Sequence, residues 1–304
     1  MSFRHLLSSQ QLSVESITEI LDTASAFLTP NGLVPMQPKT LANKRFVLAF
    51  FEPSTRTRLS FETAVQRLGG SAVVFSEAGS SVEKGETLQE TVSTIEAMGF
   101  DGMIIRHAVN GTHAAIASYS NMSVINAGEG NVAHPTQALL DASTIRERFG
   151  RIEGVKVVVV GDLQHSRVAR STSDILVRMG AQVATCAPDT LRPTDSDLSQ
   201  LRRFDSIDAA LQWADVVFLL RIQRERITGD IVPSVDVYRE LYAMTTERAM
   251  QFPKVVIMHA GPVNVGVELD EELLSSPQSL VHRQVTHGVA IRMAVRQMIF
   301  SNNG

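Results

Sequence analysis

The sequence predicts an α/β fold of two domains, each a parallel sheet flanked by helices, with a ligand site in the cleft between them. Short apolar runs of strand length alternate with stretches in which apolar residues recur at helical spacing. The predicted strands are nearly continuous in Val, Ile and Leu, as expected for strands buried on both faces. The alternation restarts near residue 150, and a chain of 304 residues suits two domains of ordinary size.

The first series of elements begins with Arg45–Phe51 (RFVLAFF), which is predicted to be a buried strand. The helix that follows places apolar residues 61, 64, 65 and 68 on one face and ends at Gly69–Gly70. Further strands are predicted at 72–75, 103–105 and 124–125, and another helix begins near Pro135.

The second series opens with a strand at 155–160 and a helix closed by Gly180. Strands follow at 182–186, 216–220 and 255–258. The last segment, Gly288–Phe300, is predicted to be a helix from its spaced apolar residues. The two series meet near residues 149–151.

The composition limits the classes of protein that need to be considered. Lys and Arg total 28 against 32 Asp and Glu, a formal charge of −4 that argues against a general nucleic-acid binder. The single cysteine, Cys186, excludes an internal disulfide and a multi-cysteine metal site. The N-terminus lacks a signal peptide's apolar region and the apolar runs are too short to span a bilayer. We expect a cytoplasmic protein with no membrane anchor, metal or cofactor.

Polar residues follow the predicted strands, and in parallel sheets ligands bind at the carboxyl ends of the strands. The first strand is followed by Glu52-Pro-Ser-Thr-Arg-Thr-Arg58, which leads into a helix. Free N–H groups, the hydroxyls of Ser54, Thr55 and Thr57, and the Arg56 guanidinium form a phosphate cradle in this interpretation. The alternative is a Ser/Thr helix cap beside solvent-facing arginines. The position directly after an apolar strand favours the anion site.

Two further strand ends in the first series carry candidate residues. Arg106 leaves the strand at 103–105 and points either into the ligand crevice or toward a structural ion-pair partner. His134 and Gln137 are three residues apart at a helix start and share one face. They are either a histidine cap beside a core glutamine or donors to a carbonyl group of a ligand.

The second series supplies more cations at its strand ends. Arg167 begins a helix after Gly161-Asp-Leu-Gln-His-Ser166, which is not the glycine fingerprint of a nicotinamide dehydrogenase. Arg221 and Gln223 follow the strand at 216–220 and face the same side if the chain stays extended. Two sets of anion-binding groups without an evident nucleophile indicate direct transfer between two bound substrates.

Several motifs in order along the chain resemble the transcarbamoylase family, most closely its aspartate-specific members. They are FFEPSTRTRLSFE (50–62), KGET (84–87), IRH (105–107), NAG (126–128), HPTQ (134–137), GDLQHSR (161–167), LRIQRER (220–226) and HAGPVN (259–264). The resemblance runs from about residue 3 to residue 300. It implies transfer of the carbamoyl group of carbamoyl phosphate to the amino group of L-aspartate, an early step of pyrimidine (UMP) biosynthesis.

The resemblance also implies a role for each matching residue. Ser54, Thr55, Arg56 and Thr57 would hold the phosphate; Thr57, Arg106 and His134 would contact the carbonyl oxygen. Gln137 and the backbone at Gly261 and Pro262 would orient the carbamoyl amino group. Arg167, Arg221, Gln223 and Lys84 would bind aspartate, with Ser81 and Lys84 entering from a neighbouring subunit of a homotrimer. Glu52 and Arg226 would act in domain closure.

The family pattern also assigns the C-terminal helix to the first domain. The implied domains are 1–149 with 288–304 for carbamoyl phosphate and 150–287 for aspartate. Ala260 and Val265 stand where many members have Pro and Arg, and Glu129 and Ala133 replace the commoner Asp and Gln. These departures affect rate and affinity more than identity, because every implied direct contact is retained.

Three alternatives remain open at this stage. An ornithine-specific or other carbamoyltransferase shares the first half of the site, but its H-C-L-P signature differs from His259-Ala-Gly-Pro262. A catalytically silent assembly homologue would be expected to lack Arg56, Lys84 or His134. A dinucleotide-dependent oxidoreductase is the weakest alternative, because the turn at 161–166 lacks the glycine fingerprint of such enzymes. Regulatory or dihydroorotase chains are possible partners.

Overall fold

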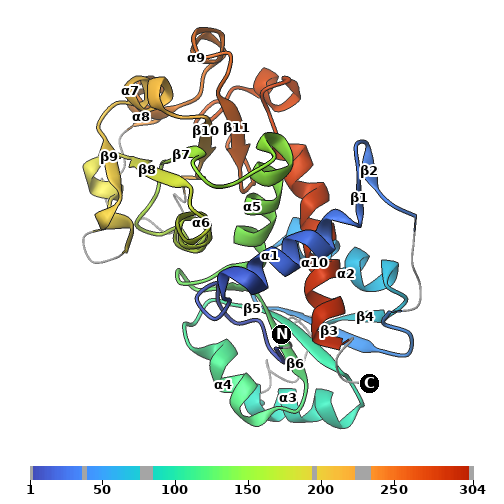
Figure 1. Ribbon diagram of the computed structural model, residues 1–304. Coiled ribbons are helices and arrows are strands. Elements are labelled where there is room, and N and C mark those ends of the chain that lie inside the picture. The colour runs from blue at the N-terminus through green and yellow to red at the C-terminus, as the bar shows by residue number, and fades with distance from the viewer. Residues whose placement is uncertain (1–2, 36–39, 76–84, 194–196, 223–233, 301–304) are drawn as a thin grey trace. The chain divides into compact units, whose positions relative to one another are not determined.

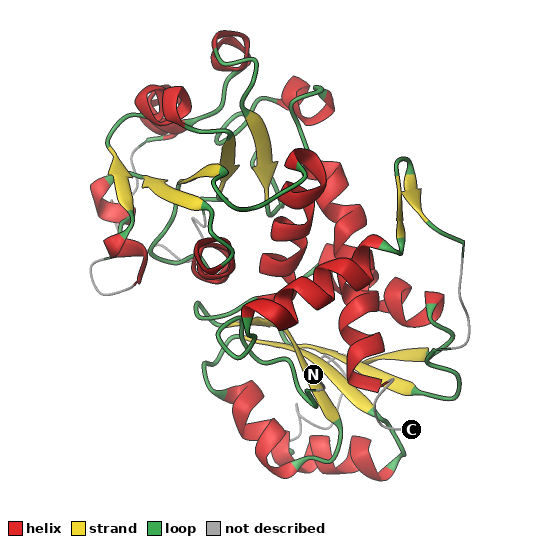
Figure 2. Ribbon diagram, viewed as in Figure 1, coloured by secondary structure: helices red, strands yellow, loops and turns green. Residues whose placement is uncertain are grey.

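The computed structural model describes residues 3–35, 40–75, 85–193, 197–222 and 234–300. The chain forms two compact units, Met1–Ser143 with Val285–Gly304 and Thr144–Gln284. Both are layers of helices on a parallel sheet, which confirms the predicted fold class (Figures 1 and 2). The divisions between the units fall inside two helices, α5 (Pro135–Phe149) and α10 (Val281–Phe300), whereas the sequence suggested ends at 149 and 287.

The first unit is built on a four-stranded parallel sheet of order β4-β3-β5-β6. Its strands are β3 (Arg45–Phe50), β4 (Ser71–Phe75), β5 (Gly102–His107) and β6 (Ser123–Glu129). Besides α5 and α10, its helices are α1 (Val14–Ser25), α2 (Thr55–Arg67), α3 (Leu88–Ala97) and α4 (Thr112–Tyr119). The small antiparallel pair β1 (Leu28–Thr29) and β2 (Gly32–Leu33) was not predicted.

The second unit contains a five-stranded parallel sheet of order β11-β10-β7-β8-β9. The strands are β7 (Lys156–Val160), β8 (Gln182–Cys186), β9 (Arg202–Phe204), β10 (Val216–Leu219) and β11 (Val256–His259). The helices are α6 (Arg167–Arg178), α7 (Ile207–Trp213), α8 (Val235–Tyr242) and α9 (Thr246–Gln251). Short 3-10 helices in the described part of this unit are η2 (Asp189–Leu191), η3 (Asp197–Gln200) and η5 (Glu271–Ser275).

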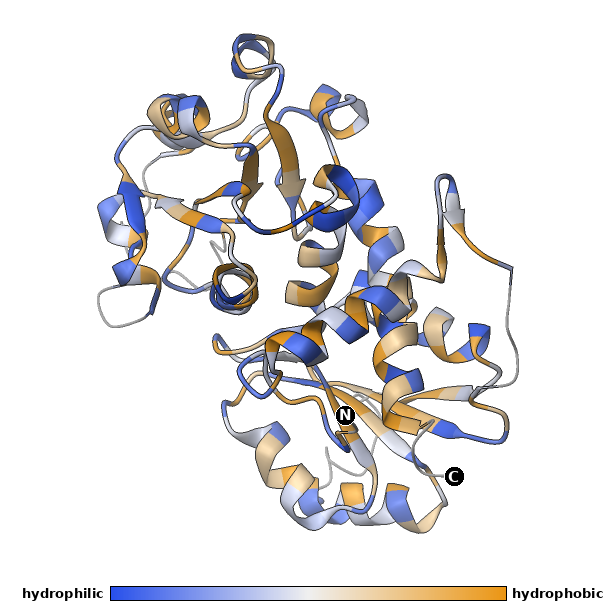
Figure 3. Ribbon diagram, in the orientation of Figure 1, coloured by the Kyte–Doolittle hydropathy of each residue, from blue (hydrophilic) through white to orange (hydrophobic). Residues whose placement is uncertain are grey.

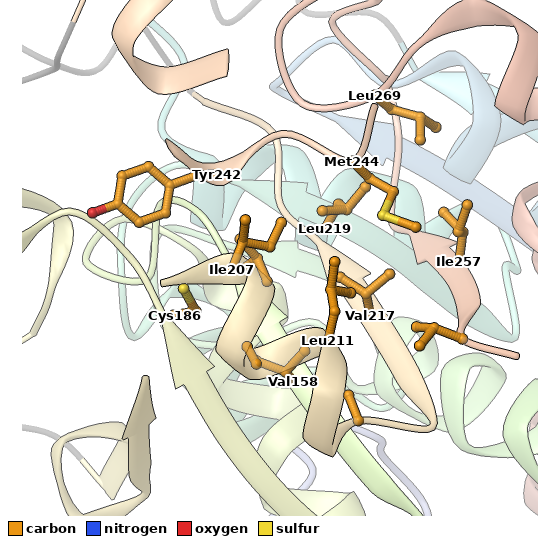
Figure 4. Close-up of a cluster of buried hydrophobic side chains, with 14 of the residues drawn as sticks. Val158, Cys186, Ile207, Leu211, Val217, Leu219, Tyr242, Met244, Ile257 and Leu269 are labelled. Atoms are coloured by element: carbon orange, nitrogen blue, oxygen red, sulfur yellow. The ribbon is translucent and has the colours of Figure 1, made fainter. Parts of the chain in front are cut away.

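The strands of the second unit have continuous apolar sequences because they are buried in its core. All residues of β10 and β11 are buried, and both strands are strongly hydrophobic (Figure 3). Val158, Val217 and Ile257 pack in one cluster with Leu211 of α7 and Cys186 of β8 (Figure 4). Burial raises the pKa of the Cys186 thiol to about 12, which favours the protonated form of the thiol at neutral pH.

Among the described residues, no helix is long and apolar enough to cross a membrane.

Candidate functional site

The first half of the candidate site lies where β3 ends and α2 begins. Ser54 is the residue before the helix, in an extended conformation, and its side chain makes no capping hydrogen bond among the described residues. Thr57 is buried, while Thr55 and Arg56 are exposed in the same turn. The Ser/Thr-cap interpretation is therefore wrong for Ser54. The hydroxyl remains beside the backbone N–H groups and the positive end of the helix dipole, where an anion binds favourably.

Arg106 lies beside this turn because β5 pairs with β3. Its partner across the ladder is Phe50, the last residue of β3. The register between β5 and β6 shifts between Ile105 and His107, and such an irregularity turns a side chain away from the regular pleat. The Arg106 Nε lies 3.3 Å from a Glu52 carboxylate oxygen, and both side chains are 15% exposed. Arg106 thus has the structural ion-pair partner that was one of its two predicted roles, namely Glu52. The pair lies at the carboxyl end of β3, the end of a parallel strand at which ligands bind.

His134 and Gln137 form the turn that enters α5, and both are buried. The Gln137 backbone N–H donates to the His134 carbonyl at 3.0 Å. The Gln137 Nε2 donates to Asp141 Oδ1 at 3.0 Å. Because an ionised carboxylate only accepts, this contact fixes the amide orientation and presents the Gln137 oxygen as the acceptor. Asp141 was missed from the sequence, although its i+4 spacing from Gln137 on one helix could have revealed it.

The buried Glu129 carboxylate makes its contacts at the start of α4. It ends β6 and accepts hydrogen bonds from the backbone N–H groups of Gly111 at 2.7 Å and His113 at 3.4 Å. Its carboxylate also lies 3.2 Å from the His113 ring. Burial opposes ionisation, but the contacts with His113 and Gly111 prevail and hold the pKa of Glu129 below its ordinary value. Glu129 therefore anchors the start of α4 to the end of β6.

A second set of predicted site residues lies at the strand ends of the second unit. Arg167 is the first residue of α6 and is buried, and Ser166 caps the helix by accepting from the Ala169 N–H at 3.1 Å. Arg221 follows β10 and donates from Nε to Asn264 Oδ1 at 3.4 Å. Gln223 and Arg226 lie outside the described residues, as do Ser81 and Lys84 of the first unit.

A buried carboxylate that sequence reasoning missed organises the loops around Arg221. Glu268 is fully buried, and its oxygens accept from the backbone N–H groups of Ile222 at 2.7 Å and Asn264 at 2.8 Å. The Asn264 Nδ2 also donates to Glu268 at 2.8 Å and to the Ile222 carbonyl at 3.2 Å. Burial raises the pKa of Glu268, although these hydrogen bonds oppose the shift. Asn264 belongs to the HAGPVN motif, and Glu268 follows it by four residues.

Gly261 and Pro262 form the turn after β11. Their peptide bond is cis, and Gly261 has φ of 65°, a left-handed conformation that glycine adopts without a Cβ clash. The Gly261 N–H donates to His259 Nδ1 at 2.7 Å, which holds the turn against the end of the strand. The backbone at Gly261 and Pro262 therefore has a defined conformation at the carboxyl edge of the sheet.

No group of three or more His, Cys, Asp or Glu side chains that could hold a metal ion occurs in the described ranges. The chemistry that the arrangement can perform comes from cations, hydroxyls and backbone donors gathered at strand ends. These groups favour phosphate and carboxylate ligands.

Comparison with known families extends this picture to nearly the whole chain. Residues 4–147 match the carbamoyl-phosphate-binding domain of aspartate/ornithine carbamoyltransferases, and residues 153–299 match the Asp/Orn-binding domain. An aspartate carbamoyltransferase catalytic subunit from Roseiflexus sp. (strain RS-1) is 46% identical over 297 residues, covering 96% of this chain and 93% of the relative. The corresponding subunit from Carboxydothermus hydrogenoformans is 42% identical over 302 residues, covering 99% and 97%.

Solved structures give the same result. An aspartate transcarbamoylase from Trypanosoma cruzi in complex with carbamoyl phosphate and aspartate has a TM-score of 0.87 at 30% identity, covering 97% of this chain and 96% of that one. The catalytic subunit of the M. jannaschii aspartate transcarbamoylase has a TM-score of 0.86 at 34% identity, covering 99% and 100%. The chain belongs to the aspartate/ornithine carbamoyltransferase family.

Proposed function

We propose that the protein is an aspartate carbamoyltransferase catalytic chain, which transfers the carbamoyl group of carbamoyl phosphate to the amino group of L-aspartate and releases phosphate. The observation that carries the proposal is the α2 N-terminal turn, whose Ser54 side chain is not used for capping among the described residues and which lies beside Arg106 on the neighbouring strand. The reaction is an early step of pyrimidine biosynthesis.

In this proposal the first unit holds carbamoyl phosphate. Ser54, Thr55, Arg56 and Thr57 bind its phosphate group. Arg106, His134 and Thr57 donate to the carbonyl oxygen, on which negative charge grows as the amine attacks. The Gln137 oxygen and the backbone of Gly261 and Pro262 orient the carbamoyl amino group.

The second unit holds aspartate in the same proposal. Arg167, Arg221 and Gln223 bind its two carboxylates, and Lys84 contributes from the loop that begins near Ser81. The uncharged amine attacks the carbamoyl carbon, the C–O bond to phosphate breaks, and the departing phosphate takes the amine proton. The rate enhancement comes from positioning and charge stabilisation.

Ornithine is the competing acceptor, and the chemistry of Arg221 argues against it. A guanidinium matches the side-chain carboxylate of aspartate, whereas ornithine would present an ammonium group to the same cation. The contact between Arg221 and Asn264, and the Glu268 network behind it, keep that guanidinium at the end of β10.

A homotrimer with shared active sites is part of the proposal. Support comes from the edge strand β4, where Val73 and Val74 are 46% and 41% exposed, and from Leu59 of α2, which is 49% exposed. An open sheet edge that carries apolar side chains is a surface that another chain covers. Ser81 and Lys84 come six and nine residues after the end of β4, so a subunit packed near this edge could deliver them to a neighbour.

The substrate assignment is tested by offering carbamoyl phosphate with either L-aspartate or L-ornithine and identifying the product by mass spectrometry. We expect carbamoyl aspartate with aspartate and no product with ornithine. Product from ornithine alone would replace the proposal with its alternative. No product from either acceptor would favour the catalytically silent homologue.

The role of Arg106 is tested by Arg106→Ala. Loss of one oxyanion donor costs about 3 kcal/mol of transition-state stabilisation, so we expect a folded protein that is at least about a hundredfold slower. Arg45→Ala is the matched control, because the exposed Arg45 lies at the opposite end of the adjacent strand. Near-normal turnover of Arg106→Ala in a steady-state assay would rule out the assignment.

A further inference from the structure

Helix α10 carries two arginines whose burial the proposed reaction does not explain. Arg292 is 3% exposed and Arg296 is fully buried, and they lie one turn apart on the same face of the helix. Both guanidiniums stack on the ring of Phe61 in α2, at 4.7 Å and 5.4 Å from the ring centre. Burial disfavours their charged forms, lowering the pKa of Arg292 to about 9 and that of Arg296 well below its ordinary value.

Arg292 contacts two of the elements that carry the proposed carbamoyl-phosphate residues, α2 and α5. Its NH2 group donates to Thr136 Oγ1 at 3.4 Å, and Thr136 lies between His134 and Gln137. Its stacking partner Phe61 lies one turn beyond Thr57 on the buried face of α2. The carboxylate of Asp141, which holds the Gln137 amide, attracts the same guanidinium. One side chain therefore links α2, the helix that carries Thr57, with the turn that carries His134 and Gln137.

The space around Arg292 fits the flat guanidinium group, which lies between Gly288 and the ring of Phe61. A Cβ at Gly288, one turn earlier in α10, would lie 2.7 Å from the Arg292 NH1 and 3.3 Å from Leu140 of α5. Because Gly288 has no side chain, the guanidinium can occupy this space. A lysine ammonium could not fill this flat space, stack on Phe61 and reach Thr136 in the same way.

Stability alone does not account for a cation at this position. Replacing a buried ion pair with apolar side chains of similar volume is commonly neutral or stabilising, so the attraction between Arg292 and the buried Asp141 carboxylate is weak evidence for a purely stabilising role. Arg296 provides the internal comparison, since it stacks on Phe61 and Phe46 but none of its guanidinium nitrogens has a hydrogen-bond partner among the described residues. Arg292 differs from Arg296 by its link to the His134–Gln137 turn.

We propose that Arg292 is a positioning residue for the carbamoyl-phosphate half-site, holding the His134–Gln137 turn in register with the N-terminal turn of α2 through Thr136 and Phe61. This inference rests on the proposed function. Arg292 acts through other residues and is not itself placed in contact with substrate.

The test compares Arg292→Met with Arg296→Met, two identical changes one turn apart. Binding of inorganic phosphate and of carbamoyl phosphate is measured by calorimetry, turnover in the steady state, and stability by thermal unfolding. We expect Arg292→Met to weaken the binding of both anions at least tenfold and to lower kcat. We expect Arg296→Met to keep wild-type binding and kcat with an equal or higher Tm.

Two further variants separate positioning from charge and from misfolding. Arg292→Lys keeps a cation, and we expect it to lose binding as Arg292→Met does. Thr136→Val removes the hydrogen-bond acceptor but keeps the arginine, and we expect it to weaken anion binding as well. This variant tests the inference even if the Arg292 variants do not fold. Wild-type binding in folded Arg292→Met, full rescue by lysine, or equal losses in Arg296→Met would overturn the inference.

The outcome also separates this inference from the proposed function. If the wild-type protein binds phosphate but forms no carbamoyl aspartate, and Arg292→Met loses that binding, the proposed function fails while the positioning role stands. If the wild-type protein is active and Arg292→Met matches it, only the positioning role fails.

Discussion

At the scale of single residues, the loops beside Arg221 depend on a buried carboxylate, Glu268. Its oxygens accept two backbone N–H groups and one side-chain amide from Ile222 and Asn264. Buried carboxylates are costly unless hydrogen-bonded, and burial raises the pKa of Glu268 as expected. Burying Glu268 therefore costs folding free energy, and its hydrogen bonds hold the loop beside Arg221 in one conformation.

Removing this carboxylate has a measurable consequence. Glu268→Ala leaves the buried Ile222 N–H and the Asn264 donors without their acceptor, and we expect the free energy of unfolding to fall by about 3 kcal/mol. We also expect a higher KM for aspartate, because Arg221 loses its support from Asn264. Urea unfolding and steady-state kinetics check both effects. The exposed Glu271→Ala is the control, and a Glu268→Ala protein as stable as that control would contradict the account.

The residue scale also shows what sequence could and could not predict about the candidate site. Ser54, Arg106 and Arg167 could be placed because parallel strands bring their carboxyl ends to one edge of a sheet, which the order of elements already implies. Asp141 could have been found from its i+4 spacing to Gln137, but Glu268 and Arg292 could not be assigned from the sequence. Their importance depends on partners that only the folded chain brings near, such as the Ile222 N–H or the ring of Phe61.

At the scale of elements, strands with long apolar runs were predicted well and short polar ones were missed. β10 and β7 are buried and apolar, so local sequence and tertiary environment agree. β9 (Arg202–Phe204) is three residues long, largely exposed and contains two arginines. It is a strand because it pairs with β8, from Ala184↔Arg202 to Cys186↔Phe204. Such pairing overrides a local pattern that has no strand signal.

The junction of β6 and α4 yields a prediction about pH. The pKa of Glu129 is lowered in the folded protein, so its carboxylate stabilises the fold above the ordinary value of 4.5 and loses that contribution as the pH falls through the lowered pKa. Glu129→Gln should therefore be less stable than wild type at pH 7, with the difference shrinking at acid pH.

Urea unfolding between pH 7 and pH 3 measures this convergence. Glu240→Gln, at an exposed position of α8, is the matched control and should follow the wild-type curve. A Glu129→Gln protein that runs parallel to wild type across the whole range would show that the charge of Glu129 contributes nothing at this junction.

At the scale of the whole molecule, the formal charge of −4 does not describe the strand ends of the two units, which carry arginines. Arg106 lies at a strand end of one unit, and Arg167 and Arg221 follow strands of the other. Arg292 is buried in the first unit, against Phe61 and Thr136. The net charge excludes a broadly basic protein, but only the positions of the arginines along the order of elements indicate a phosphate and a dicarboxylate as ligands.

The burial of Cys186 makes the only thiol of the chain a built-in reporter of opening of the second unit. A thiolate-directed reagent such as dithionitrobenzoate should leave the native protein unmodified, because the thiol is enclosed in the β8 core and its pKa is about 12. Labelling should begin only when that core separates, at a rate set by the free energy of opening. A reaction with native protein as fast as with urea-unfolded protein would contradict this prediction. Slow labelling would let the stability of one unit be followed within the intact chain, with no introduced probe.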